Sequence, residues 1–379
     1  MYNEEDFEDI RPYHDKEVNP ALKRIISQPA FDKIIDFFFG EQERDKIKQQ
    51  LSETYSSHDF QQNFMHPLVS SIVKKTSKGL TYDGFDQLTP GIPYLFIANH
   101  RDIVLDSAML QVLLLDNGHL TSEITFGSNL MINQFVIDLG KVNRMFKVIR
   151  GGNKMEFLKN SRLLSAYIRY TIVSKKTSIW IAQRSGRTKD GNDKTEASLL
   201  KMFNMSAKGS FTDAFGELNI VPLVVSYEYE PCCAFKIKEL LATGKDVIYH
   251  KKPDEDLVSI INGITQPKGR IHISIGKPVN QYLKLIDKED GLKNKIEKLT
   301  RLIDDTVYRY FKLWPNNYIA YDLLYNCQDY NRFYNTTEKN MFLEYMGNEI
   351  NGIDGEKKSI EELFLKIYAN PLINLKRIK

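Results

Sequence analysis

The sequence predicts an α/β fold in which a central, mainly parallel mixed sheet is flanked by helices, with further helices before and after it. Short β-rich runs alternate with helical segments between Leu80 and Lys277, the pattern of a parallel sheet with crossover helices. The segments on either side show apolar residues at helical spacing instead. We therefore predict a helical N-terminal domain at 1–76, an α/β domain at 77–284 and a helical C-terminal region at 285–379.

The N-terminal domain is expected to be a small group of helices. Apolar residues recur at helical spacing from Pro20 to about Lys75, and Gly40 marks a break between helices. The run Phe37–Phe39 has lysines on both sides and could dip into a bilayer surface. A place in the core of a helical bundle is the simpler interpretation of the same residues.

The α/β domain is expected to alternate strands with covering helices. The predicted strands are Tyr94–Ala98, Ile124–Phe126, Phe146–Ile149, Ser178–Ala182, Ile220–Ser226 and Ile271–Ile275. The helix predicted at Ile103–Leu115 is apolar almost all round and should be buried, whereas the helix at Met155–Val173 has one apolar stripe. Pro222 lies inside its strand, which is tolerated at a sheet edge or at a strand start. Helices therefore cover both faces of the predicted sheet.

The C-terminal region is expected to be helical from about Lys284. Ile296, Leu299 and Ile303 repeat at helical spacing, and a tyrosine-rich tail follows Pro315. Tyrosines on one helical face can bind nucleic acid or carbohydrate, but no row of basic residues accompanies them here. Packing is the better interpretation of these rings.

Composition and charge exclude several classes of function. The 379 residues carry a net charge of only +3, too little for the basic stripe that binds a nucleic-acid backbone, so no nucleic-acid partner is expected. The three cysteines have neither a disulfide framework nor metal-ligand spacing, so no metal site is expected and a reducing, cytoplasmic compartment fits. The acidic start lacks the features of a signal peptide, and apolar runs are too short to span a bilayer. Any membrane contact would be peripheral, on the inner face of the cell membrane.

A histidine is placed where an open α/β sheet binds its ligands. The strand that ends at Ala98 is followed by Asn99 and His100, just before the buried helix. Histidine can accept a hydroxyl proton near neutral pH, and a carboxylate on its second ring nitrogen would fix its orientation. Asp102 and Asp106 are both available for that role, and Asp102 could instead cap the helix.

Two further strand ends carry arginines. Arg150 follows one strand and precedes Gly151 and Gly152, an arrangement suited to a phosphate although also typical of a salt-bridged turn. Another strand is followed by the loop 183–191, where Arg184, Arg187 and Lys189 stand among small residues. Arginine supplies the fixed, bidentate donors that a phosphate prefers.

Four blocks resemble, in order and separation, the four motifs of the glycerolipid acyltransferase superfamily, which includes glycerol-3-phosphate and lysophosphatidic acid acyltransferases. The blocks are NHRDIVLD, FKVIRGG, IWIAQRSGRTK and IVPLVV, and HISIGKPV resembles the strand and turn that often close this domain. The third block looks closest to the plastid glycerol-3-phosphate acyltransferase version, with small residues where bacterial relatives have a glutamate. The resemblance covers roughly residues 78–280 and implies that 77–284 is an acyltransferase domain.

The resemblance implies roles for individual residues. His100 and an aspartate would be catalytic, and Arg150, Arg187 and Lys189 would bind the acceptor and its phosphate, with Arg184 and Arg101 from the same motifs in the substrate-binding set. The chemistry implied is transfer of an acyl group from acyl-CoA or acyl carrier protein, as co-substrate and without a cofactor. The acceptor would be a hydroxyl of glycerol-3-phosphate or 1-acylglycerol-3-phosphate.

The first block departs from the family pattern in its spacing. The family has four residues between histidine and aspartate, whereas five separate His100 from Asp106. We expect Asp106 to keep the role, because the residues after it form the expected helix, with Asp102 as the alternative. Two other functions stay open: transfer to an amino-acid-containing lysolipid, and a lipid- or phosphate-binding protein that has lost catalysis.

Overall fold

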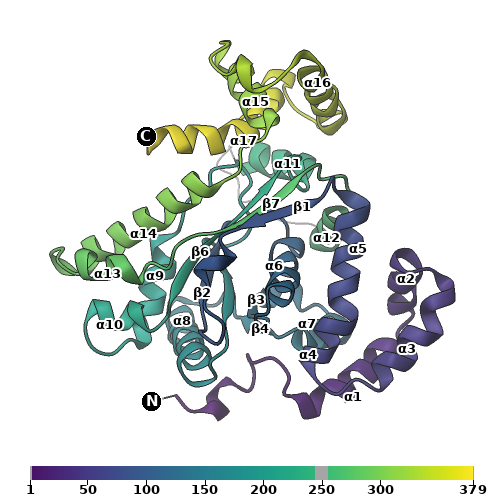
Figure 1. Cartoon of the computed structure of the whole chain (residues 1–379), viewed down its shortest axis with the longest axis vertical. Coiled ribbons are helices and arrows are strands. Elements are labelled where there is room, and N and C mark those ends of the chain that lie inside the picture. The colour runs from purple at the N-terminus through teal and green to yellow at the C-terminus, as the bar shows by residue number, and fades with distance from the viewer. Residues whose placement is uncertain (1, 244–254, 379) are drawn as a thin grey trace.

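The computed structural model describes residues 2–243 and 255–378, so Met1, Lys379 and the segment 244–254 of the predicted domains lie outside the described residues. Seven strands form one sheet in the order β1-β7-β6-β2-β5-β3-β4 (Figure 1). They are β1 (Leu80–Asp83), β2 (Leu95–Ala98), β3 (Glu123–Gly127), β4 (Met145–Val148), β5 (Ile179–Ala182), β6 (Ile220–Tyr227) and β7 (Ile271–Ile275). Every neighbouring pair is parallel except β6 and β7. The predicted α/β fold with a mainly parallel mixed sheet is confirmed.

Helices cover both faces of the sheet (Figure 1). On one face lie α1 (Asp15–Ile26), α2 (Pro29–Phe38), α3 (Arg44–Ser52), α4 (Ser57–Phe60), α5 (His66–Thr76), α6 (Leu105–Asp116), α7 (Gln134–Val142) and α12 (Glu255–Thr265). On the other lie α8 (Lys154–Arg169), α9 (Ala197–Phe203), α10 (Phe211–Gly216), α13 (Asn280–Ile286) and α14 (Gly291–Tyr310). Alternate side chains of β2 belong to the two cores, Phe96 and Ala98 to one and Leu95 and Ile97 to the other, as the two-residue period of a strand requires.

The N-terminal helices share their core with the sheet. Leu22 of α1 and Phe31 of α2 belong to the same buried cluster as Phe96 of β2 and Leu110 of α6. In the Phe37–Phe39 run, Phe38 is buried in that cluster while Phe37 is exposed. The bundle interpretation therefore holds for the middle ring of the run.

The C-terminal helices form a separate cap. Helices α15 (Pro315–Tyr325), α16 (Thr336–Ile350) and α17 (Lys357–Arg377) gather at the top of Figure 1 and pack with α11 (Cys233–Thr243) around a third core. Tyr318 stacks on Phe333, and Tyr321 packs against Tyr325, so these rings pack as expected.

The carboxyl ends of the parallel strands form one edge of the sheet, where the predicted site residues follow β2, β4 and β5. Pro222 is the third residue of β6, before the pairing with β7 begins at Leu223, which explains how a central strand accommodates it.

Candidate active site

The site is centred on His100, which follows β2 at the carboxyl edge of the sheet. Its Nδ1 lies 2.9 Å from Oδ2 of Asp106, at the start of α6. A carboxylate can only accept, so Nδ1 carries the hydrogen and Nε2 keeps the lone pair of a base. The ring packs edge-to-face on Trp180 of β5 at 5.3 Å, and 13% of the side chain is exposed. The histidine is thus oriented on two sides and remains accessible.

Asp106 is fully buried, and both of its carboxylate oxygens accept hydrogen bonds. Its Oδ2 also accepts the N–H groups of Arg101 and Asp102, at 2.6 and 2.9 Å, and its Oδ1 accepts the hydroxyl of Tyr227 at 2.7 Å. Burial alone would raise the pKa of Asp106, but the hydrogen bond and charge of His100, with these donors, hold that pKa below its ordinary value. Asp106 therefore stays ionised and can stabilise an imidazolium.

Asp102 has a different environment. Its Oδ1 accepts the N–H groups of Val104 and Leu105, so it caps the entry to α6, and Oδ2 lies against Gly263 of α12 without a hydrogen-bond partner among the described residues. Burial and the neighbouring charge of Asp106 raise the pKa of Asp102. The extra residue of the first block is therefore absorbed in the turn before α6, and Asp106 is the aspartate that meets the histidine.

The loop after β5 is fastened beside His100. The N–H of Gln183 donates to the carbonyl of Ala98, and the N–H of Thr188 donates to the carbonyl of His100 itself, both at 2.7 Å. Between these anchors Arg184 and Arg187 are half-buried, and each has a buried nitrogen without a hydrogen-bond partner among the described residues, Nε and Nη1 respectively. Both arginines therefore have an unused donor in a loop bonded to the backbone of His100, and the charge of Arg187 acts on Asp102 in the same turn, which favours an anionic ligand there.

Arg101 and Lys189, two of the predicted substrate-binding residues, form ion pairs with carboxylates of the protein itself. Arg101 is buried and bonded to Asp193 and Glu230, which outweigh the effect of burial and raise its pKa. The prediction that it binds substrate is wrong, because all of these contacts are internal. Lys189 forms an ion pair with Glu239 of α11, so a phosphate would compete with that carboxylate.

Arg150 lies at the same edge of the sheet but three strands from β2, about 14 Å away at the usual strand spacing. Its side chain is exposed, its guanidinium lies against Gly127, and its N–H donates to Ser128 Oγ at 3.1 Å. Within the described part of the chain no contact joins it to His100 or Arg187. The expected convergence of all three on one cavity is not seen.

Several residues of the site were missed from the sequence. Tyr227 ends β6 and completes the donors around Asp106. Asp193, Glu230 and Lys236 form a buried ionic network with Arg101, which fixes the turn that carries His100. Lys268, whose pKa burial lowers to about 8, lies near Asp102. The available signal was their position in the sequence, because Tyr227 ends and Glu230 closely follows β6, a strand that pairs with β2.

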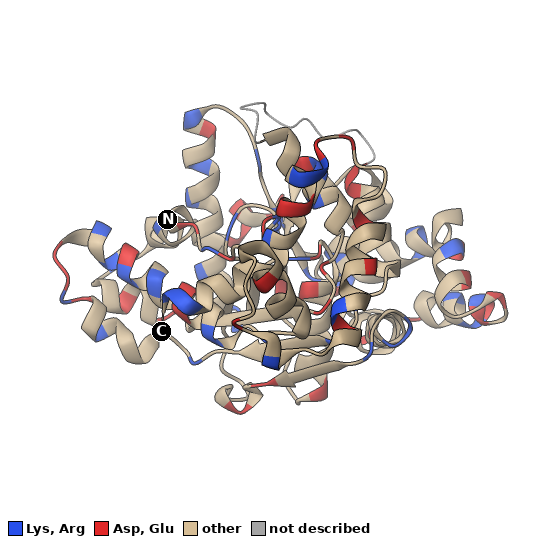
Figure 2. Cartoon of the chain, turned by 90° about the horizontal axis from the view of Figure 1, so that it is seen from above, with Lys and Arg blue, Asp and Glu red and all other residues tan. Residues whose placement is uncertain are grey.

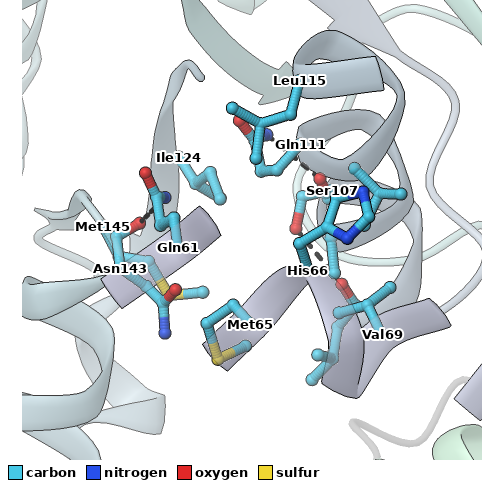
Figure 3. Close-up of a pocket in the computed structure, with 13 residues that line it drawn as sticks. Gln61, Met65, His66, Val69, Ser107, Gln111, Leu115, Ile124, Asn143 and Met145 are labelled. Atoms are coloured by element: carbon cyan, nitrogen blue, oxygen red, sulfur yellow. Dashed lines mark hydrogen bonds between the residues drawn. The ribbon is translucent and has the colours of Figure 1, made fainter. Parts of the chain in front are cut away.

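A small, largely apolar cavity lies along α6 (Figure 3). It leaves about 40 Å³ of free space between α5, α6, β3 and the end of α7, and it is partly open to solvent. Val104, Ala108 and Val112 line it from α6, and Met65 and Val69 face them from the N-terminal helices. The lining includes Val104 and Ser107, which flank Asp106 in the sequence, but neither Asp106 nor His100 itself.

The adjacent cysteines predicted to have a packing role are buried and free, and Cys232 Sγ donates to the carbonyl of Ser259 at 3.2 Å. In the described part of the chain, no cluster of His, Cys, Asp or Glu side chains could hold a metal ion. Nor is any helix there long and apolar enough to cross a bilayer.

No family model and no curated protein matches the chain. Among solved structures it is similar to the 1-acyl-sn-glycerophosphate (LPA) acyltransferase PlsC from Thermotoga maritima, with 13% sequence identity and a TM-score of 0.39. The match covers 78% of this chain and 95% of that one. A likeness at this TM-score does not define a function, which has to come from the chemistry of the site.

Proposed function

We propose that the protein is an O-acyltransferase of phospholipid biosynthesis. It would move a fatty acyl group from acyl-CoA or acyl carrier protein to a hydroxyl of glycerol-3-phosphate or 1-acylglycerol-3-phosphate. The observation that carries the proposal is the 2.9 Å contact between His100 and Asp106, since it joins the two residues that the resembled motif makes catalytic. The unused guanidinium donors of Arg184 and Arg187, in the loop bonded to the backbone of His100, support an anionic acceptor.

In the proposed reaction, Nε2 of His100 takes the proton of the acceptor hydroxyl as its oxygen attacks the thioester carbonyl. The tetrahedral intermediate collapses with cleavage of the C–S bond, and the departing thiolate takes the proton back from the imidazolium. Asp106 stabilises that imidazolium and holds the ring in the required tautomer, and Tyr227 fixes Asp106 in turn. The products are an ester and a free thiol, and no acyl-enzyme forms in this scheme because the acceptor oxygen attacks the thioester directly.

The cavity along α6 is the proposed site of the acyl chain. Its lining extends along α6 from Val104 to Leu115, and with only about 40 Å³ of free space it would have to widen to admit a long chain. Its walls are mainly apolar, which suits a hydrocarbon chain. A chain bound there would have its carbonyl near the start of α6, where Asp106 holds His100.

The test is thiol release from acyl-CoA and acyl carrier protein with a panel of acceptors. Glycerol-3-phosphate or 1-acylglycerol-3-phosphate should drive release, and Arg187→Ala should raise the KM for that acceptor by about tenfold or more. Arg301→Ala, which removes an exposed arginine of α14, is the matched control and should have no effect.

Two outcomes would replace the proposal. Release driven only by an amino-acid-containing lysolipid would assign the same chemistry to another head group, with Arg187 facing a carboxylate. Binding of acceptor without any thiol release would make the protein a non-catalytic lipid- or phosphate-binding protein. In the sequence, the extra residue before Asp106 favoured a non-catalytic protein. In the structure, Asp106 contacts His100 despite that extra residue.

A further inference from the structure

Large apolar side chains are exposed around the edge of the sheet that carries the site. Met155 and Phe157 on the first two turns of α8 are 81% and 63% exposed, and Ile132 in the loop after β3 is 63% exposed. Leu257 and Ile261 are exposed on the first turns of α12. These five residues and Leu158 are called the apolar rim. A soluble surface rarely exposes so many large apolar groups together without a binding role.

The parts of the apolar rim are physically connected. The N–H of Arg150, just before α8, donates to Ser128 Oγ after β3. The neighbouring Asn129 donates from Nδ2 to Asp256 Oδ2 at the start of α12, at 3.4 Å. The loops after β3 and β4 and the start of α12 therefore form one continuous surface.

The beginning of α8 stands free of the protein. Every residue from 151 to 159 is exposed, and only the later turns pack on α9 and the core. Met155 and Phe157 are separated by about 200° around the helix axis. A protein partner covers one side of a helix, whereas the interfacial layer of a bilayer surrounds an inserted tip. The encircling apolar residues thus favour a lipid surface over a protein one.

The charge near this tip is suited to anionic lipid. Arg150, Lys154, Lys159 and Arg162 lie within thirteen residues, against the single carboxylate of Glu156, which is occupied by the N–H of Asn153. These four cations form no ion pair within residues 2–243 and 255–378. Elsewhere basic and acidic positions are intermingled along the ribbon (Figure 2). Cations beside exposed apolar groups are the combination that holds peripheral proteins on anionic bilayers.

We propose that the apolar rim is a membrane-docking surface, in which the tip of α8 inserts into an anionic bilayer and Arg150 and its neighbouring lysines contact lipid phosphates. Docking there would bring the carboxyl edge of the sheet, with His100, to the lipid surface. The idea that a lipid acceptor or product crosses this surface rests on the proposed function, whereas docking itself does not.

The experiment measures co-sedimentation of the full chain with vesicles of phosphatidylglycerol or of phosphatidylcholine alone. We expect the wild-type protein to bind phosphatidylglycerol vesicles, and the double variant Met155→Glu/Phe157→Glu to bind about tenfold more weakly or less. Phe37→Glu is the matched control, because Phe37 is 62% exposed on α2, away from the apolar rim, and it should bind as the wild type does. Thiol release with soluble glycerol-3-phosphate and acyl-CoA, without vesicles, should be unchanged in both variants.

Equal vesicle binding by the wild type and the double variant, or loss of binding only in Phe37→Glu, would overturn the proposal. So would a double variant that loses activity only with acyl carrier protein as donor, because that would make the tip of α8 a protein-docking site. A protein that binds vesicles through the apolar rim but releases no thiol would uphold docking while removing the proposed function.

Discussion

At the scale of single residues, the two aspartates of the turn before α6 have separate tasks. Asp106 orients His100 and is held ionised by four donors, while Asp102 caps the helix and faces Gly263. The distinction depends on which backbone N–H groups each carboxylate accepts. The sequence could nominate both residues but could not choose by spacing alone, because the choice is made by the conformation of residues 101–104.

The variant Asp106→Asn should lower kcat about a hundredfold or more, because the amide cannot stabilise the imidazolium. Asp102→Asn keeps an acceptor for the helix cap and should lower kcat far less. Steady-state thiol release with both variants, alongside circular dichroism, separates the two. A larger loss of kcat in Asp102→Asn would reverse the assignment.

A second residue-scale prediction concerns Asp304 of α14, whose Oδ1 accepts the N–H of Thr195 at 2.8 Å. Burial raises the pKa of Asp304 to about 6. The folded chain therefore binds this proton more readily than the unfolded chain, whose value is about 3.9. This group's contribution to stability falls as pH rises from about 4 through 6, and the loss is complete above that window.

Asp304→Asn removes this penalty and keeps the acceptor for Thr195. It should raise the free energy of unfolding at pH 8 by roughly 1–3 kcal/mol, with the gain shrinking towards zero near pH 4. Urea denaturation at pH 4.5 and pH 8 measures both values. Asp354→Asn, at an exposed position, is the control, and an equal gain at the two pH values for Asp304→Asn would contradict the assignment.

At the scale of elements, the C-terminal helix α17 holds the arginine-bearing loop. Asn370 Nδ2 donates to the carbonyl of Asp190 at 2.6 Å. Gly191, at φ +76°, lies so close to the carbonyl of Ile367 that a Cβ there would be 2.0 Å from the oxygen. A further contact ties α17 to the ionic network, since the N–H of Glu230 donates to Tyr368 Oη at 2.8 Å.

We therefore predict that Asn370→Ala raises the acceptor KM several-fold by loosening this loop, with a stability cost of about 1 kcal/mol. Asn351→Ala, at an exposed site between α16 and α17, should change neither quantity. Acceptor titrations by thiol release test this, with urea denaturation in parallel. An unchanged KM in Asn370→Ala would show that α17 contributes to stability alone.

The cavity along α6 gives a second element-scale prediction. Ala108 lines its middle, so Ala108→Phe should narrow it and shift the preference towards shorter acyl donors. The change is measured as kcat/KM over a series of acyl-CoA lengths, with Ala242→Phe on the last turn of α11 as a control outside the cavity. A uniform effect at all lengths would place the acyl chain elsewhere.

The elements near the site were largely predictable from the sequence. All six predicted strands are present, and the buried helix after His100 lies at Leu105–Asp116. These elements could be predicted because continuous apolar runs and apolar stripes are local patterns that mark buried strands and helices. The edge strand β1, Leu80–Asp83, was missed because it is short and mostly exposed. Its pairing with β7, about 190 residues away, is not encoded locally.

At the scale of the whole molecule, the position of each site residue is set by contacts between distant segments. Arg101 reaches Asp193 and Glu230, which lie 92 and 129 residues further along the chain. The motif that contains Arg101 suggested substrate binding. Only the folded structure shows that its guanidinium is already bonded to two buried carboxylates. The order of the strands likewise explains why Arg150 is far from His100, since β4 and β2 are three strands apart in the sheet.

The central claim, that His100 is the base of an acyl transfer, is tested most directly by acceptor-dependent thiol release from acyl-CoA in His100→Ala. We expect kcat to fall about a hundredfold to ten-thousandfold, with unchanged circular dichroism and thermal midpoint. Activity within a few-fold of the wild type in a folded His100→Ala protein would contradict it.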